Sequence, residues 1–79
     1  ERAAAEGWKV CATIRSWGIC GVAPETMGFG PVPSIQQACD KAGIKVGEVD
    51  YFEINEAFAA QYLACEKALE LDRDKCNVN

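Results

Sequence analysis

DYFEINEAFAAQYLAC, the stretch from Asp50 to Cys65, joins a strand-like segment to a helical one. The aromatic and β-branched residues of Asp50–Ile54 predict a strand, and the helix formers that follow predict a helix over Glu56–Leu71. Asn55 stands between them, where its side chain can cap the helix by accepting backbone N–H hydrogen bonds near Phe58. Such a junction between strand and helix is where ligands tend to bind in α/β folds.

Two further elements precede this stretch. Apolar and polar residues alternate along the chain after Trp8 and predict a strand over Lys9–Val22, with a bend near Ser16, where the alternation changes phase. An apolar stripe at helical spacing predicts a helix over Val32–Ala42. Residues 1–7, ERAAAEG, read as the end of a preceding helix closed by glycine.

The order of these elements predicts an α/β fold, β-α-β-α-β, whose last strand begins at Cys76. Strand, helix and strand in succession call for parallel pairing and a right-handed crossover. From Ala57 to Cys65 the only strongly polar side chain is Gln61, and a helix that is apolar nearly all round is predicted to be buried. Two helices cannot cover both faces of a parallel sheet. We therefore expect a piece of a larger domain that is marginally stable by itself.

The composition of the chain limits the classes of function that it can have. The chain has 79 residues, a net charge of −4 and 49% hydrophobic residues, as in globular proteins. No basic pattern favours nucleic acid or anionic membranes, and no apolar run is long enough to span a bilayer. There is no histidine, and the five cysteines are irregularly spaced without a CxxC pair. We expect buried or half-buried free thiols rather than disulfides or a metal site.

The connection Gly21–Pro33 is rich in glycine and proline and predicts a loop. Met27 and Phe29 are large apolar residues within it, where polar residues are usual. They either pack into the core or line a pocket, and the residues alone favour the core.

Three stretches resemble the thiolase family in order and spacing: Gly21-x-x-Pro24-x-x-Met27-Gly28-x-Gly30-Pro31, Asn55-Glu56-Ala57-Phe58-Ala59 and Asn77-Val78-Asn79. The similarity covers the chain from Trp8 onward, and the run AFAAQYLACEKALELD is most similar to mitochondrial 3-ketoacyl-CoA thiolases, also called acetyl-CoA acyltransferases. The resemblance implies a fold of two similar α/β halves, with residues 1–79 as the first part of the C-terminal half. It also implies cleavage of 3-ketoacyl-CoA by CoA, or condensation of acyl-CoA units, through a cysteine thioester.

The chain also departs from the family. The motifs that carry the family's nucleophilic cysteine, its histidine and its second cysteine are not among these residues. We therefore expect the isolated 79 residues to be inactive and to need the rest of a thiolase chain. The alternative is a non-catalytic thiolase-like α/β module that binds CoA or a protein partner.

The resemblance assigns roles to individual residues. It implies that Asn55 is catalytic and holds a water that donates to the thioester oxygen in an oxyanion hole, with a simple helix cap as the competing interpretation. It implies that Met27, Ala57 and Phe58 bind substrate by shaping the acyl and pantetheine end of the pocket, with core packing the alternative for Met27 and Phe58. For Glu56 we expect only a favourable charge in the first helical turn.

Partners and compartment also follow from the resemblance. It implies CoA as a substrate, with no separate cofactor or metal. The expected partners are acyl-CoA, the remainder of the thiolase chain and further copies in a homo-oligomer, without nucleic acid or a membrane span. The implied compartment is the mitochondrial matrix, with the peroxisome or cytoplasm as alternatives.

Overall fold

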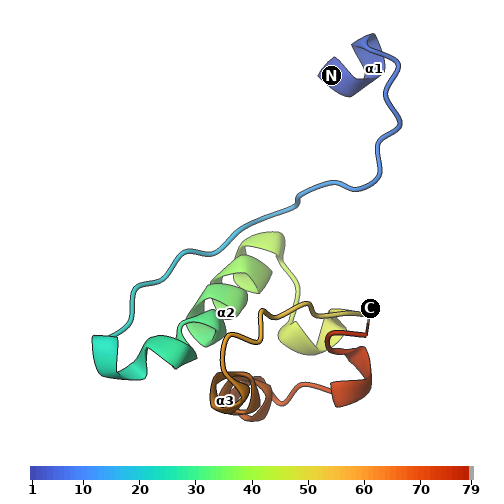
Figure 1. Cartoon of the computed structure of the whole chain (residues 1–79). Coiled ribbons are helices and arrows are strands. Elements are labelled where there is room, and N and C mark those ends of the chain that lie inside the picture. The colour runs from blue at the N-terminus through green and yellow to red at the C-terminus, as the bar shows by residue number, and fades with distance from the viewer. Residues whose placement is uncertain (79) are drawn as a thin grey trace.

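The computed structural model describes residues 1–78 and shows helices joined by extended segments (Figure 1). The main helices are α2 (Pro31–Ala42) and α3 (Ala59–Leu69), and a short α1 (Arg2–Ala5) precedes them. The 3₁₀ helices are η1 (Pro24–Phe29), η2 (Val46–Glu48) and η3 (Arg73–Lys75). Along the described part of the chain, no helix combines the length and the apolar character needed to cross a membrane.

The predicted helix over Val32–Ala42 is confirmed as α2. It begins at Pro31, where the missing proline N–H would have no helical partner in any case. It ends before Gly43, which is left-handed with a φ of 72° and donates its N–H to the Asp40 carbonyl at 3.0 Å. Glycine adopts this conformation without steric cost, which is why the helix ends there. The predicted loop before it is partly helical, because η1 leads directly into α2.

The predicted helix over Glu56–Leu71 is present as the shorter α3. It begins only at Ala59, because Phe58 before it is extended, and no side chain caps its N-terminus. The interpretation of Asn55 as the helix cap is therefore wrong. At the other end, Glu70 terminates the helix in the left-handed conformation with a φ of 53°.

The predicted strands are not confirmed. Lys9–Val22 is extended, but no backbone-to-backbone hydrogen bond joins it to another described segment. Asp50–Ile54 contributes a single parallel bridge, from Phe52 to Cys76. A strand needs a ladder of hydrogen bonds to a neighbour, and residues 1–78 supply only this one pair. The β-α-β-α-β description is therefore not confirmed, although the one bridge is parallel as predicted.

The second half of the extended segment lies along α2 (Figure 1). Ser16 Oγ donates to the Ala38 carbonyl at 2.7 Å, and Lys41 Nζ donates to the Trp17 carbonyl at 3.1 Å. Ser16 is also where the apolar alternation changes phase, so that change marks the place where the chain meets the helix. The first half leads away to α1, which Gly7 closes with a φ of 69°, as the sequence predicts.

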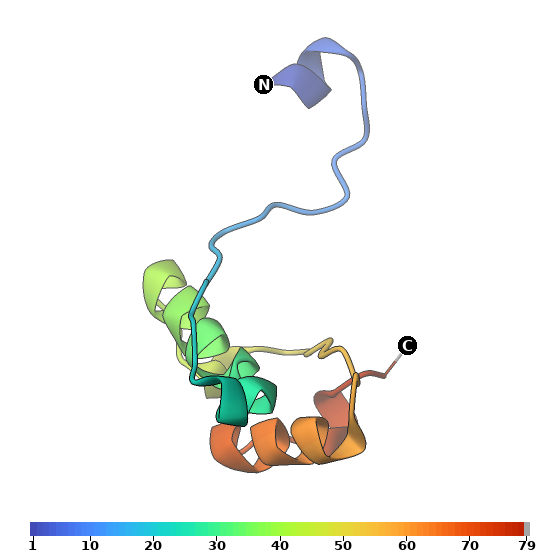
Figure 2. The same ribbon diagram turned by 60° about the vertical axis from the view of Figure 1, so that its left-hand side comes forward.

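A small core forms where α2 packs against α3 (Figure 2). It consists of Val32 from α2 with Cys65 and Leu69 from α3, flanked by Ile35, Val46 and Leu71. Burial of α3 is one-sided, because Leu63 on the same helix is 51% exposed. The predicted burial of this helix on nearly all sides is therefore wrong for the chain alone.

The five cysteines are free thiols. Cys39, Cys65 and Cys76 are buried, which agrees with the sequence expectation. Cys11 and Cys20 are exposed, so the expectation of burial is wrong for these two residues of the extended segment.

Candidate functional site

An open groove lies between η1 and the start of α3, with a volume of about 660 Å³; we call it the apolar groove. Its large side chains are Met27 and Phe29 from η1 and Phe58 from the residue before α3. The remaining lining residues are Glu25, Thr26, Gly28, Ala60, Gln61 and Ala64. Met27 is 63% exposed and Phe29 is 41% exposed, so the expectation that they pack into the core is wrong.

A hydrogen bond and close backbone packing hold η1 against α3. Cys65 Sγ donates to the Gly28 carbonyl at 3.5 Å. Burial raises the pKa of the Cys65 thiol, which keeps it protonated and able to donate at neutral pH. A Cβ atom on Gly28 would lie 3.4 Å from Cβ of Gln61, so the backbone of η1 runs close to the helix.

A second groove, of about 390 Å³, contains Asn55; we call it the amide groove. It lies between α2 and the segment that leads to α3. Its lining residues are Gly18, Pro31, Ser34, Ile35, Ala38, Glu53, Ile54, Asn55 and Gln61. The structure thus places Asn55 beside α2 rather than at the N-terminus of α3.

Asn55 is exposed and follows the buried Ile54. Within residues 1–78 its side-chain amide has no hydrogen-bond partner. Because it does not cap α3, both its carbonyl oxygen and its NH₂ group are available to a bound molecule.

Gln61 lines both grooves and was not predicted as a site residue. Its Oε1 atom is buried and has no hydrogen-bond partner in the described chain. A buried acceptor without a donor costs free energy, so such atoms usually meet a water, a ligand or a further protein group. The sequence does contain a signal for this role: Gln61 is the only strongly polar side chain in the apolar stretch from Ala57 to Cys65.

The remaining residues of the junction take different positions. Ala57 is exposed in the bend before α3 and is absent from the lining of both grooves. Glu56 accepts a hydrogen bond from Nδ2 of Asn77 at 2.6 Å. It is not in the first turn of a helix, because α3 begins at Ala59, so the role expected for its charge is wrong.

Comparisons with known proteins agree with the motifs. Residues 8–79 match the family model described as "Thiolase, C-terminal domain". The peroxisomal 3-ketoacyl-CoA thiolase 5 of Arabidopsis thaliana is 47% identical over 74 residues, which cover 94% of this chain and 16% of that protein. The β-ketothiolase BktB of Cupriavidus necator is 51% identical over 81 residues, covering 100% of this chain and 21% of that protein.

Solved structures show the same relationship. The crystal structure of human mitochondrial 3-ketoacyl-CoA thiolase has a TM-score of 0.95 at 44% identity, covering 99% of this chain and 20% of that one. A structure of the same human protein in complex with CoA has a TM-score of 0.94. The chain spans about a fifth of the length of the relatives that it matches. By sequence, motif and three-dimensional structure, the chain belongs to the thiolase family and corresponds to part of its C-terminal domain.

Proposed function

We propose that this chain supplies part of the thioester-binding site of a thiolase. The apolar groove receives the acyl and pantetheine end of a CoA thioester, shaped by Met27 and Phe58 with Ala57 next to them in the sequence. Asn55, in the adjoining amide groove, holds a water that donates to the thioester oxygen. CoA is the substrate, and the site uses no separate cofactor or metal.

One observation carries the proposal. The apolar groove and the amide groove meet at Gln61, and the Asn55 amide in the second groove has no partner in residues 1–78. An oxyanion hole needs a neutral donor that is already in place before the reaction, next to a cavity for the reacting group. The similar human thiolase, whose structure was solved in complex with CoA, supports CoA as the ligand.

The proposed reaction is cleavage of a 3-ketoacyl-CoA by CoA, or the reverse condensation, through a cysteine thioester. These residues contain no histidine, and none of their cysteines lies in the family's cysteine motifs. The nucleophile and the proton-transfer groups therefore come from the remainder of a thiolase chain, and these residues are inactive alone. We further propose that the complete protein is a homo-oligomer in the mitochondrial matrix. The relatives of this chain include peroxisomal and bacterial as well as mitochondrial proteins.

The second candidate is a non-catalytic module that uses the same grooves to bind CoA or a protein partner. It needs only the two grooves, which these residues contain. The coding sequence separates the two candidates. A reading frame that continues after residue 79 into a glycine pair and a Gly-His-Pro motif supports the enzyme, and a stop codon there supports the module.

The proposal is tested by Asn55→Ala and Asn55→Asp in the complete thiolase. Loss of one oxyanion donor typically lowers kcat by ~10²–10³, and KM should change little because ground-state binding uses other contacts. The melting temperature should stay the same, because Asn55 neither caps α3 nor bonds to another described residue. Asn55→Asp should also lower kcat, since a carboxylate would repel the developing oxyanion. A normal kcat in both variants would end the catalytic assignment.

A further inference from the structure

The side-chain amide of Asn77 binds both backbone polar groups of Ile54, its N–H and its carbonyl. Asn77 Oδ1 accepts from the Ile54 N–H at 2.7 Å, and Asn77 Nδ2 donates to the Ile54 carbonyl at 2.9 Å. Nδ2 also donates to a carboxylate oxygen of Glu56 at 2.6 Å. These three bonds engage the amide's acceptor and its donors. They also hold the residue before Asn55 and the residue after it.

This arrangement continues the parallel bridge between Phe52 and Cys76. The Phe52 N–H donates to the Lys75 carbonyl at 2.8 Å, and the Asn77 N–H donates to the Phe52 carbonyl at 2.8 Å. The next pair of bonds, to Ile54, comes from the Asn77 side chain in place of a backbone peptide. Asn77 itself has a φ of 50°, so its backbone turns away while its side chain continues the pairing. Asparagine adopts this conformation more readily than most residues do.

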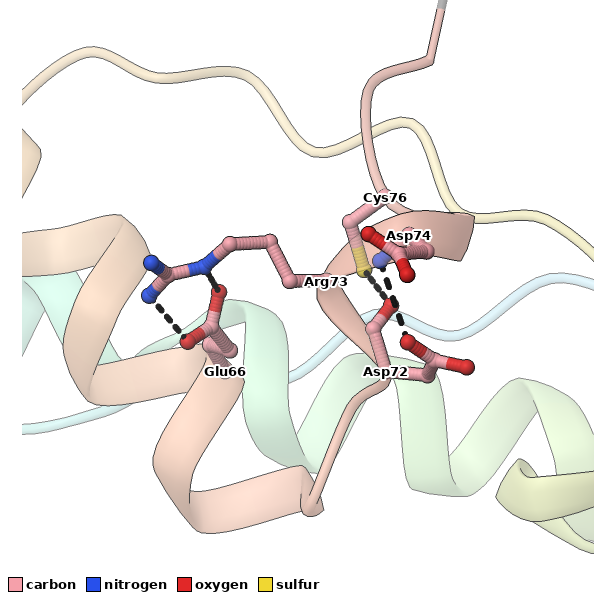
Figure 3. Close-up of polar contacts among 5 residues, drawn as sticks. All are labelled: Glu66, Asp72, Arg73, Asp74 and Cys76. Atoms are coloured by element: carbon pink, nitrogen blue, oxygen red, sulfur yellow. Dashed lines mark hydrogen bonds and ion pairs between the residues drawn. The ribbon is translucent and has the colours of Figure 1, made fainter.

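The segment that carries Asn77 is itself fixed to α3 (Figure 3). Arg73 of η3 makes two bonds to the Glu66 carboxylate of α3, at 2.6 and 3.0 Å. Asp72 caps η3 by accepting from the Asp74 N–H at 3.0 Å. Buried Cys76 donates through Sγ to the Asp72 carbonyl at 3.2 Å. Asn77 thus follows a segment that is bonded to α3 and within itself.

We propose that Asn77 is a positioning residue that sets the direction of the Asn55 side chain by fixing the Ile54 backbone before it and the Glu56 side chain after it. This inference rests on the proposed function, in which Asn55 holds the water for the thioester oxygen. An oxyanion donor works only if its geometry is set before the reaction, and a misplacement of about 1 Å can cost ~10²-fold in rate. Asn77 makes no contact with substrate in this proposal and acts only through Asn55.

A double-mutant cycle in the complete thiolase tests the proposal. Asn77→Ala should lower kcat by ~10–10², with KM nearly unchanged, because the change misplaces Asn55 without removing binding contacts. In an Asn55→Ala background, Asn77→Ala should cause no further loss of kcat, because the group that it positions is already gone. A purely structural role for Asn77 would lower the melting temperature and leave the loss of kcat independent of Asn55.

Glu56→Ala keeps the test decisive if Asn77→Ala does not fold. It removes one of the three bonds and leaves the pair to Ile54 in place. Its loss of kcat should be smaller than that of Asn55→Ala and should disappear in the Asn55→Ala background. Equal losses in both backgrounds, or no loss at all, would overturn the positioning role. If Asn55→Ala alone leaves kcat unchanged, the proposed function fails instead, whatever the effect of Asn77→Ala.

Discussion

Gly18 lies so close to Ser34 that a Cβ atom at residue 18 would overlap the Ser34 backbone carbonyl. The extended segment and α2 therefore touch backbone to backbone at this point, beside the amide groove. Glycine is required at residue 18 because there is no space for a side chain, and not because its backbone is left-handed.

Gly18→Ala should lower stability by about 1–3 kcal/mol, the usual cost of forcing an extra carbon into a packed contact. Gly21→Ala is the matched control, because a Cβ atom there meets nothing within 4 Å and its φ is not positive. It should be neutral or slightly stabilising. Thermal unfolding of the two variants, made in the complete thiolase, measures the difference. Equal melting temperatures would show that the close approach does not persist in solution.

The ion pair between Glu66 and Arg73 predicts sensitivity to acid. Hydrogen bonds from Arg73 hold the pKa of Glu66 below its ordinary value of 4.5. Because the folded pKa is the lower one, the pair's stabilisation is fully present above pH 4.5 and is lost as the pH falls through the folded pKa. NMR titration of the Glu66 carboxyl carbon measures this shift. In Arg73→Gln the pKa of Glu66 should rise toward 4.5, and an unchanged value would contradict the assignment.

Met27 and Phe58 should set the preference for acyl-chain length if the apolar groove binds the acyl group. Met27→Ala and Phe58→Ala each enlarge the groove, so kcat/KM should shift in favour of longer chains in the complete enzyme. One methylene in an apolar pocket is worth about 1–3 kcal/mol, so the shift should reach at least ~10-fold between successive chain lengths. Met27→Leu conserves volume and serves as the control. Parallel losses for every chain length would exclude a specificity role.

The 79 residues by themselves should be at best marginally folded. Their core cluster contains only three buried residues, and Trp8, Ile14 and Ile19 are 58%, 84% and 80% exposed. Little apolar area is therefore removed from water to offset the loss of conformational entropy. Urea unfolding followed by circular dichroism measures the margin. A sharp cooperative transition with several kcal/mol of stability would contradict this expectation.

The helices could be predicted from the sequence because their signals are local. The apolar stripe of α2 and the stop at Gly43 lie within one segment, and the structure places both as expected. The sequence could not show whether the predicted strands pair, because pairing depends on a neighbouring segment. Residues 1–78 provide only the bridge at Phe52. Local pattern shows that a segment is extended, and it does not show what lies beside it.

The candidate site was predicted in part. Met27 and Phe58 share one groove, as the family motifs imply, while Asn55 lies in the groove next to it. The start of α3 was placed too early because Glu56 is a good helix former, whereas its carboxylate is bonded to Asn77 and the helix begins at Ala59. That bond joins residues separated by 21 positions, so no local pattern could have indicated it.

The extended segment over Lys9–Val22 has a consequence for handling the isolated chain. Its backbone makes no hydrogen bond to the backbone of any other described segment, and its apolar side chains are exposed. Before Ser16, where the segment meets α2, it is an open edge, which is a template for strand addition from another molecule. Concentrated solutions of the 79-residue chain should therefore form β-rich aggregates through this edge, and a lysine or proline placed at Ile14 should improve solubility more than any change in the small core.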